Sequence, residues 1–203
     1  MALCFGSLFA YVSGSSLVLI GIMGLSPKMY GLLVAATSFG LLAGSLLDAR
    51  LNRIGMSHQT SIAAGLGVIV ASTVLLLVRS LTGSLTAAPL VAMIVISHVG
   101  HAVVRANAVQ GSLEPVPEIA GVASAVIAGL QMVVGGTTSA IAATLFDSRT
   151  ANAMTGTMTV CALGAMLICT LVVRPADRKR GHTKEHMHML SDDEMVDVPV
   201  EVG

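Results

Sequence analysis

The chain has 203 residues, of which 54% are hydrophobic and only 11% charged, and its mean hydropathy is +0.85. Soluble domains carry roughly 25% charged residues, so this composition excludes an ordinary water-soluble fold. The formal net charge is zero, but the charged residues are sparse up to residue 173 and concentrated in the C-terminal segment, 174–203. The net charge therefore neither indicates nor excludes an acidic or basic partner.

Six nearly uncharged stretches follow one another along the chain. A transmembrane helix needs about 20 consecutive apolar residues. The stretches are Ala2 to Leu25, Lys28 to Leu47, Thr60 to Val78, Ala87 to Ser112, Ile119 to Phe146 and Ala151 to Val173. No basic segment precedes the first, so we predict a span there and not a cleaved signal peptide. The predicted fold is an all-α integral membrane bundle of six transmembrane helices over residues 1–173.

Local signals mark where these helices begin and how they pack. Ser26 followed by Pro27 predicts a capped start of the second span. Membrane helices associate through small residues that let their backbones approach. Gly40 and Gly44 in the second span, and the spacing Gly121, Ala125, Gly129 in the fifth, predict two such packing faces.

Six spans place both termini on one side of the membrane. With the termini inside, the cytoplasmic face carries most of the Lys and Arg residues: Arg50, Arg53, Arg105, Arg174, Arg178, Lys179, Arg180 and Lys184. The outer face carries Lys28, Arg79 and Arg149. The positive-inside rule therefore predicts a multi-pass protein of the inner (plasma) membrane with cytoplasmic termini. The polar segment 174–203 predicts a disordered cytoplasmic tail, whose basic run 178–180 is expected to bind anionic lipid.

Several chemistries are not indicated. Cys4, Cys161 and Cys169 lie in apolar sequence without metal-ligand spacing, which favours packing roles. The tail histidines, His182, His186 and His188, lack a scaffold, so we predict no metal site and no cofactor. The sequence has no zinc-protease or nucleophile-elbow motif and no mid-span pair of aspartates, so an enzyme is not predicted. Nucleic-acid binding is not predicted either, because the basic surface is limited to the tail.

The stretch from Gly44 to Gly55 concentrates charge after the second span. We expect Asp48, Arg50 and Arg53 to lie in a short turn at the cytoplasmic face. Arginines in such a turn also serve topology alone. Alternatively, Gly44 allows close helix approach while Asp48 accepts hydrogen bonds at the start of the next helix or pairs with an arginine, which would latch two helices.

This spacing, Gly44-x-x-x-Asp48-x-Arg50-x-x-Arg53-x-Gly55, resembles the glycine–aspartate–arginine loop motif in the second half of major facilitator superfamily transporters. The family's first-half motif has arginine directly after the aspartate, whereas Ala49 intervenes here. The resemblance implies that these five residues form a cytoplasmic gating loop.

A second stretch, from Asn107 to Gln131, resembles the loop and eleventh helix of the drug:proton antiporters of the bicyclomycin/chloramphenicol-resistance (Bcr/CflA) type. The matching features are Asn107-Ala108, then Pro117, then the run Ala120 to Ala125. Together with GLSPKMYGLL, the resemblance covers about Ala2 to Val173. It implies a bundle equivalent to helices seven to twelve, one half of a twelve-helix transporter.

The resemblance also implies that the first, second, fourth and fifth spans surround a central cavity. In the fourth span His98, His101 and Arg105 are spaced i, i+3 and i+7, along one helical face. Ionisable residues at membrane depth usually mark a functional site. Arg105 is also near enough to the inner end to reach headgroups, and His101 is also expected to bond a neighbouring group. His98, nearest mid-membrane, is the main candidate for a titratable cavity residue.

Other polar residues in apolar spans are candidate substrate contacts. They are Tyr11, Ser15, Ser16 and Gln131. Each could instead bond a neighbouring helix, which we favour for the serines. No carboxylate lies within a span, so the proton site belongs either to an N-terminal half, which we favour, or to the histidines.

The expected function is that of the C-terminal half of a multidrug efflux transporter. It would export small, largely hydrophobic compounds by proton-coupled alternating access. Its partners would be the lipid bilayer, a drug-like substrate, protons, and an N-terminal six-helix half or a second copy of the chain. The alternative is a truncated or non-transporting membrane subunit with a structural or regulatory role.

Overall fold

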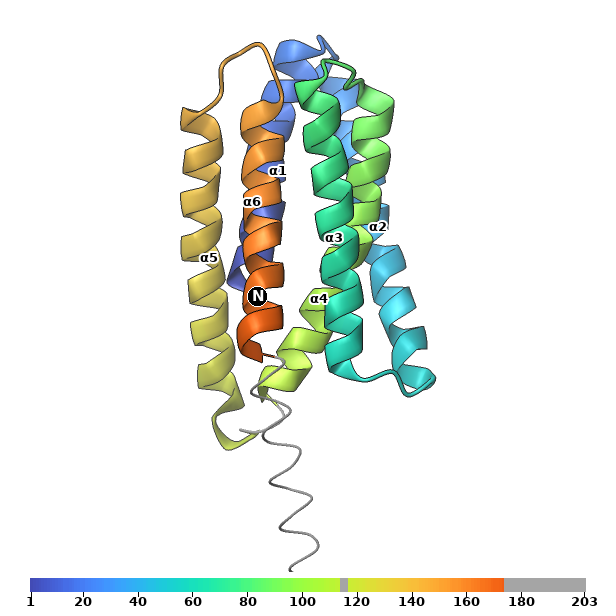
Figure 1. Cartoon of the computed structure of the whole chain (residues 1–203), viewed down its shortest axis with the longest axis vertical. Helices are drawn as coiled ribbons and strands as arrows, with labels where there is room; N and C mark the ends of the chain where they lie inside the picture. The colour runs from blue at the N-terminus through green and yellow to red at the C-terminus, as the bar shows by residue number, and fades with distance from the viewer. Residues whose placement is uncertain (114–116, 174–203) are drawn as a thin grey trace, which may run out of the picture. The chain divides into compact units, whose positions relative to one another are not determined.

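The computed structural model describes residues 1–113 and 117–173 (Figure 1). Its helices are α1 (Ala2–Ser16), α2 (Pro27–Arg53), α3 (His58–Leu81), α4 (Ala87–Leu113), α5 (Ala120–Thr144) and α6 (Asn152–Ile168). π-helical turns continue α1 over Leu17–Ile22 and α6 over Cys169–Val173, and a 3-10 turn over Pro117–Ile119 precedes α5. Within the described residues, six helices are long and apolar enough to cross a membrane, which confirms the predicted fold class. The predicted tail, 174–203, lies outside the described residues.

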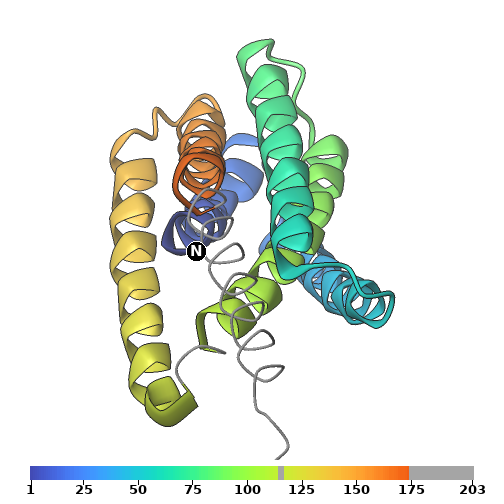
Figure 2. The ribbon, with the colours of Figure 1, turned by 60° about the horizontal axis from the view of Figure 1, so that its bottom comes forward.

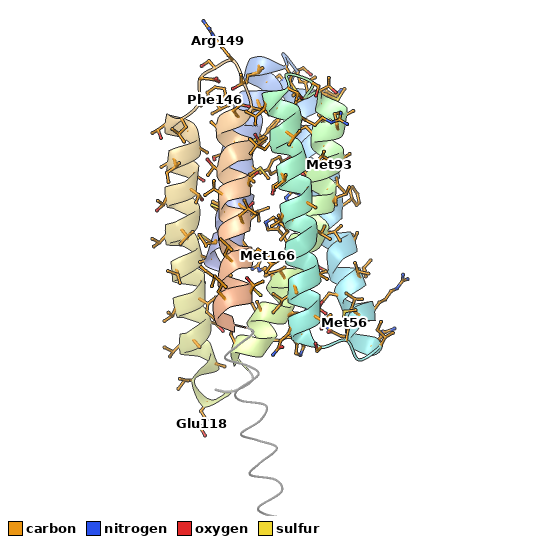
Figure 3. All side chains as sticks on the ribbon, viewed as in Figure 1. Met56, Met93, Glu118, Phe146, Arg149 and Met166 are labelled. Atoms are coloured by element: carbon orange, nitrogen blue, oxygen red, sulfur yellow. The ribbon has the colours of Figure 1, made fainter. Side chains whose placement is uncertain are left out.

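Residues 1–166 form one compact unit. Within it, the α2–α3 turn and the start of α5 lie at one end, and the α5–α6 connection lies at the other, as the labels Met56, Glu118, Phe146 and Arg149 show (Figure 3). We call the first of these the α2–α3 end.

α2 is longer than the second predicted span. Asp48, Arg50 and Arg53 belong to the last two turns of α2, so the prediction that they lie in a turn after Leu47 was wrong. Charged residues end an apolar run, but they do not interrupt helical hydrogen bonding. The chain turns only at Gly55, whose φ of +76° is a left-handed conformation that favours glycine.

The starts of α2 and α3 are capped by serine side chains. Ser26 Oγ accepts a hydrogen bond from the Met29 backbone N–H at 3.3 Å, and Pro27 is the first residue of α2, as predicted. Ser57 Oγ accepts from the Thr60 N–H at 3.3 Å in the same way. Each cap satisfies one of the backbone donors that a helix start leaves without an intrahelical acceptor.

The helices pack in two groups. α4 packs along both α2 and α3, and α1 packs along α5. Figure 2 shows α5 on one side of α1 and the α3–α4 pair on the other. α6 lies between α1 and α3, where Ser7 Oγ donates to the Met158 carbonyl at 3.1 Å and Thr159 Oγ1 donates to the Thr73 carbonyl at 3.0 Å. A third bond, from Ser80 Oγ of α3 to Asn152 Oδ1 at the start of α6, is 2.7 Å long, so side-chain hydrogen bonds connect α6 to both neighbours.

The two predicted small-residue faces behave differently. A Cβ added at Gly40 would lie 2.5 Å from the Val95 carbonyl oxygen, and one at Gly44 would lie 2.5 Å from the Val99 carbonyl oxygen. These glycines therefore let α2 lie directly on α4, as predicted. In contrast, a Cβ at Gly121 or Gly129 would meet no atom of the described residues within 4 Å. The prediction that this second face packs against another helix of the chain was wrong, because no described helix lies against it.

Burial is unequal among the helices. In α1 and α4, 50% of the most apolar 18-residue window is buried, against 17% in α2 and 11% in α5. Large apolar side chains are exposed along α2 (Leu32, Phe39, Leu42 and Leu46) and along α5 (Val122, Val126, Leu130 and Val133). Figure 3 shows side chains on both sides of α5, including the side turned away from α6. α2 and α5 thus each carry an open apolar face.

Candidate functional site

Two clusters of polar side chains lie within the apolar bundle. The first, at the α2–α3 end, comprises Asp48 and Asn52 of α2, His58 of α3 and Asn107 of α4; we call it the end cluster. The second lies deeper and comprises Tyr11 of α1, Thr37 of α2, and His98 and His101 of α4; we call it the mid-bundle cluster.

Asp48 is the centre of the end cluster. Its side chain is only 6% exposed. One carboxylate oxygen accepts a hydrogen bond from Asn107 Nδ2, and the other accepts from Asn52 Nδ2 at 3.2 Å. The donors thus come from its own helix and from α4. The prediction that Asp48 accepts bonds at the start of the next helix or pairs with an arginine was wrong.

Asn107 connects three helices. It is fully buried, and its amide nitrogen donates both to Asp48 and to the Val103 carbonyl, the latter at 2.9 Å. Since that nitrogen is committed as donor, its Oδ1 is the acceptor for His58 Nδ1 at 2.7 Å. His58 therefore carries a proton on Nδ1. The chain of bonds from His58 through Asn107 to Asp48 joins the start of α3, α4 and the end of α2.

The sequence singled out Asn107 as part of a family motif but not as a site residue. The signal available was an amide in a largely apolar span, where an unbonded amide is costly.

The other members of the predicted gating loop lie apart from this cluster. Arg50 and Arg53 are exposed, and so is Gly55, which has open space around its Cα. Gly44 lies one helical turn before Asp48 and contacts α4 through Val99 and Ala102. A pocket beside the cluster is lined by Asn52, Gly55, Met56, Ser57, His58 and Gln110. Of the five predicted loop residues, Gly44 and Asp48 hold α2 on α4, and the arginines face outward.

The mid-bundle cluster consists of ring contacts and hydroxyl bonds. The Tyr11 and His98 ring centroids are 5.4 Å apart in an edge-on arrangement, and those of His98 and His101 are 6.2 Å apart. Tyr11 and Thr37 share a hydroxyl hydrogen bond at 3.3 Å. Tyr11, His98 and His101 are 3%, 5% and 7% exposed. Three of the predicted cavity residues are therefore together, but in the junction of α1, α2 and α4.

His101 uses both ring nitrogens. Nδ1 lies 2.8 Å from the Ser97 carbonyl oxygen and 3.4 Å from Ser97 Oγ. Nε2 lies 3.1 Å from the carbonyl oxygen of Cys4, which is 97 positions away in α1. Bonding of His101 to neighbouring groups agrees with the sequence interpretation.

His98 is buried without full hydrogen bonding. Its Nδ1 has no hydrogen-bond partner in the described part of the chain. Buried polar atoms in proteins are nearly always bonded, so an exception such as this one calls for an explanation.

The remaining predicted cavity residues lie apart. Ser15 bonds Tyr30 at 3.1 Å and the Val12 carbonyl at 3.2 Å, which is the structural role favoured from the sequence. Ser16 is half-buried in α1, and Gln131 is buried in α5. Arg105 is exposed. α1 contacts α4 at His101 through the Cys4 carbonyl, near the start of α1, and Arg105 lies one helical turn beyond that contact. The expected common face of His98, His101 and Arg105 thus divides into a buried pair and an exposed cation.

Two curated proteins resemble the chain. A bicyclomycin resistance protein homolog of Haemophilus influenzae is 27% identical over 164 residues, which is 80% of this chain and 40% of that protein. An uncharacterized MFS-type transporter, YdgK of Bacillus subtilis, is 30% identical over 132 residues, which is 64% of this chain and 32% of that protein. No family model and no solved structure matches the chain.

These similarities, together with six helices long and apolar enough to span a membrane, support membership of the major facilitator superfamily. The chain spans 40% or less of the length of the two relatives.

Proposed function

We propose that the chain is the C-terminal half of a drug-exporting major facilitator transporter and that it works with an N-terminal six-helix half. The observation that carries this proposal is the unequal burial: the most apolar windows of α2 and α5 are 17% and 11% buried, against 50% in α1 and α4. Two half-transporters that rock against each other need such faces. The Haemophilus influenzae relative, a bicyclomycin resistance homolog, supports a drug-like substrate.

In this proposal the α2–α3 end is cytoplasmic, as the positive-inside rule predicts. The end cluster then fixes the inner ends of α2, α3 and α4 to one another. These helices move as one body during alternating access. Arg50 and Arg53, which are exposed, are available to the other half or to anionic lipid headgroups.

Substrate would pass along the open faces of α2 and α5 and the adjacent parts of α1 and α4. Arg105, the exposed ionisable group on α4, would contact the passage directly. Tyr11, His98 and His101 would form a polar layer behind it, whereas Ser15, Ser16 and Gln131 stay separate candidate contacts. Export of small, largely hydrophobic compounds is coupled to inward proton movement.

A complementation experiment tests the proposal. The chain is co-expressed with the residues of the Haemophilus influenzae relative that lie outside the matched region, and bicyclomycin tolerance and co-purification are measured. The expected result is that the two pieces co-purify and raise tolerance only together. Val126→Arg on the open face of α5 should abolish both, whereas Val160→Arg, an equally exposed position on α6, should abolish neither.

The second candidate is a non-transporting membrane subunit with a structural or regulatory role, which six apolar helices would suit equally well. Co-purification without tolerance to any drug tested would support this candidate and contradict export. Crosslinking of a Val126→Cys chain to itself, with no dependence on the other piece, would show a homodimer instead.

A further inference from the structure

The two buried histidines of α4 carry an inference about proton binding. His98 and His101 are one helical turn apart, and their ring centroids are 6.2 Å apart. Both are more than nine-tenths buried, with exposed fractions of 5% and 7%. A structural histidine in such a place is expected to have each nitrogen matched to a partner of fixed role.

His101 has acceptors for two N–H groups. Ser97 O and Cys4 O are carbonyl oxygens, which only accept, and they lie 2.8 Å and 3.1 Å from Nδ1 and Nε2. A neutral imidazole has a single N–H, whereas the imidazolium has two. The protonated ring therefore satisfies both carbonyls at once and joins α4 to α1.

The neutral ring is also accommodated. Ser97 Oγ lies 3.4 Å from Nδ1 and can donate its hydroxyl proton to that nitrogen when Nδ1 is unprotonated. Nε2–H then keeps its bond to the Cys4 carbonyl. Ser97 thus offers Nδ1 an acceptor through its carbonyl and a donor through its hydroxyl, so the site has partners for both protonation states.

We propose that His101 is a reversible proton-binding site in which Ser97 serves both protonation states, and that His98 restricts the pair to one proton. Two imidazolium rings at this separation would repel strongly inside the bundle. In this arrangement the unpartnered Nδ1 of His98 carries no proton, and the His98 ring stays neutral while His101 is charged.

Among the described residues around His98 and His101, the histidines are the groups best suited to bind a proton near neutral pH. α1 presents the titratable Tyr11 and the backbone carbonyl of Cys4 to them, and α2 presents the uncharged Thr37 and Gly40. α3 meets α4 beside them through Gly65 and Ile69 against Gly100. The nearest carboxylate along the α2–α4 contact is Asp48, which is bonded to Asn52 and Asn107. Arg105, one turn beyond His101, is exposed.

As a step in proton-coupled export this inference rests on the proposed function, but proton binding is testable on the chain alone. The experiment is a nitrogen-15 NMR titration of the full chain, labelled at histidine, in lipid nanodiscs between pH 5 and 9. His98→Gln and His101→Gln variants assign the signals. The expected result is that His101 changes from two protonated nitrogens to one within this range, while His98 keeps a single protonated nitrogen. A His101 that stays neutral throughout, or two imidazolium rings at pH 5, would overturn the proposal.

The Ser97→Ala variant tests whether the Ser97 hydroxyl acts as a hydrogen-bond donor to neutral His101 or only fills space between helices. It removes the hydroxyl donor of the neutral form but leaves the carbonyl acceptor, so a larger fraction of His101 should hold two protons at pH 7. Ser72→Ala is the matched control, because Ser72 is a buried serine in α3 that bonds only carbonyls of its own helix, Val68 and Ile69. An equal fraction in wild type and Ser97→Ala would contradict the proposal.

The titration and the complementation experiment fail independently. Normal His101 titration without drug tolerance would count against export alone. Proton-coupled export with a His101 that never titrates would count against the proton site alone.

Discussion

The end cluster and the mid-bundle cluster both place polar side chains inside the apolar bundle, but they differ in how completely those side chains are hydrogen-bonded. In the end cluster every described polar atom of Asp48 and Asn107 has a partner, and each donor and acceptor role is fixed by the next. In the mid-bundle cluster His98 Nδ1 lacks a partner and His101 Nδ1 has two partners of opposite role. A fully bonded network fixes helices in place, whereas an incompletely bonded one leaves room for a proton or a ligand.

The largest expected effect is the loss of Asn107. Asn107→Ala leaves the buried Asp48 carboxylate without its α4 donor and His58 without its acceptor, so we expect a loss of about 3 kcal/mol of unfolding free energy. Reversible unfolding in mixed micelles measures this. The control is Asn52→Ala, which removes a 3.2 Å bond within one helix at a half-buried site and should cost less than about 1 kcal/mol. Equal losses would show that the cross-helix bond has no special weight.

Next come the glycines between α2 and α4, which lie beside both clusters. An added methyl at Gly40 would lie 2.5 Å from the Val95 carbonyl oxygen and 2.9 Å from His98 Cβ. Gly40→Ala should therefore destabilise the bundle by about 1–3 kcal/mol, because the helices must separate. The control Gly129→Ala meets open space and should be neutral or stabilising by up to about 1 kcal/mol, since alanine favours helix. The same unfolding assay compares them, and similar values would contradict the packing described.

His98 should matter little for stability. His98→Leu removes a buried ring whose Nδ1 is unbonded, so the loss of ring contacts is offset by removal of an unsatisfied polar atom, and we expect a change within about 1 kcal/mol. Drug tolerance with the complementary half should nevertheless fall. A loss of stability as large as that of Asn107→Ala would mean that both clusters are structural.

The smallest effect concerns Asp147, the exposed counterpart of Asp48. Its carboxylate accepts from the Thr150 and Arg149 backbone N–H groups and from the Thr150 hydroxyl. The Thr150 backbone bond, then the Arg149 bond, lower the pKa of Asp147 from 3.8 to about 2. A lowered folded-state pKa stabilises above the unfolded value, so this contribution is present above pH 3.8 and is lost as pH falls to about 2. Carboxyl NMR titration gives the midpoint, and Asp147→Asn should alter unfolding far less than Asn107→Ala, because solvent screens an exposed site.

The sequence by itself determined the six spans, the Ser26–Pro27 helix start and the α2 packing face at Gly40 and Gly44. These follow from apolar length, capping chemistry and small-residue spacing, which are local along the chain. It also placed Tyr11, His98 and His101 among the candidate site residues. The tertiary structure shows that they lie together.

Only the tertiary structure decided which partner each polar group takes. Asp48 bonds Asn107, 59 positions away, and not a neighbouring arginine, and His101 meets the Cys4 carbonyl, 97 positions away. It also showed that the spacing Gly121, Ala125, Gly129 faces open space, although it resembles the packed face of α2. The physical reason is that a helix presents side chains by periodicity alone, whereas the occupant of the opposite face depends on how the helices are arranged around it.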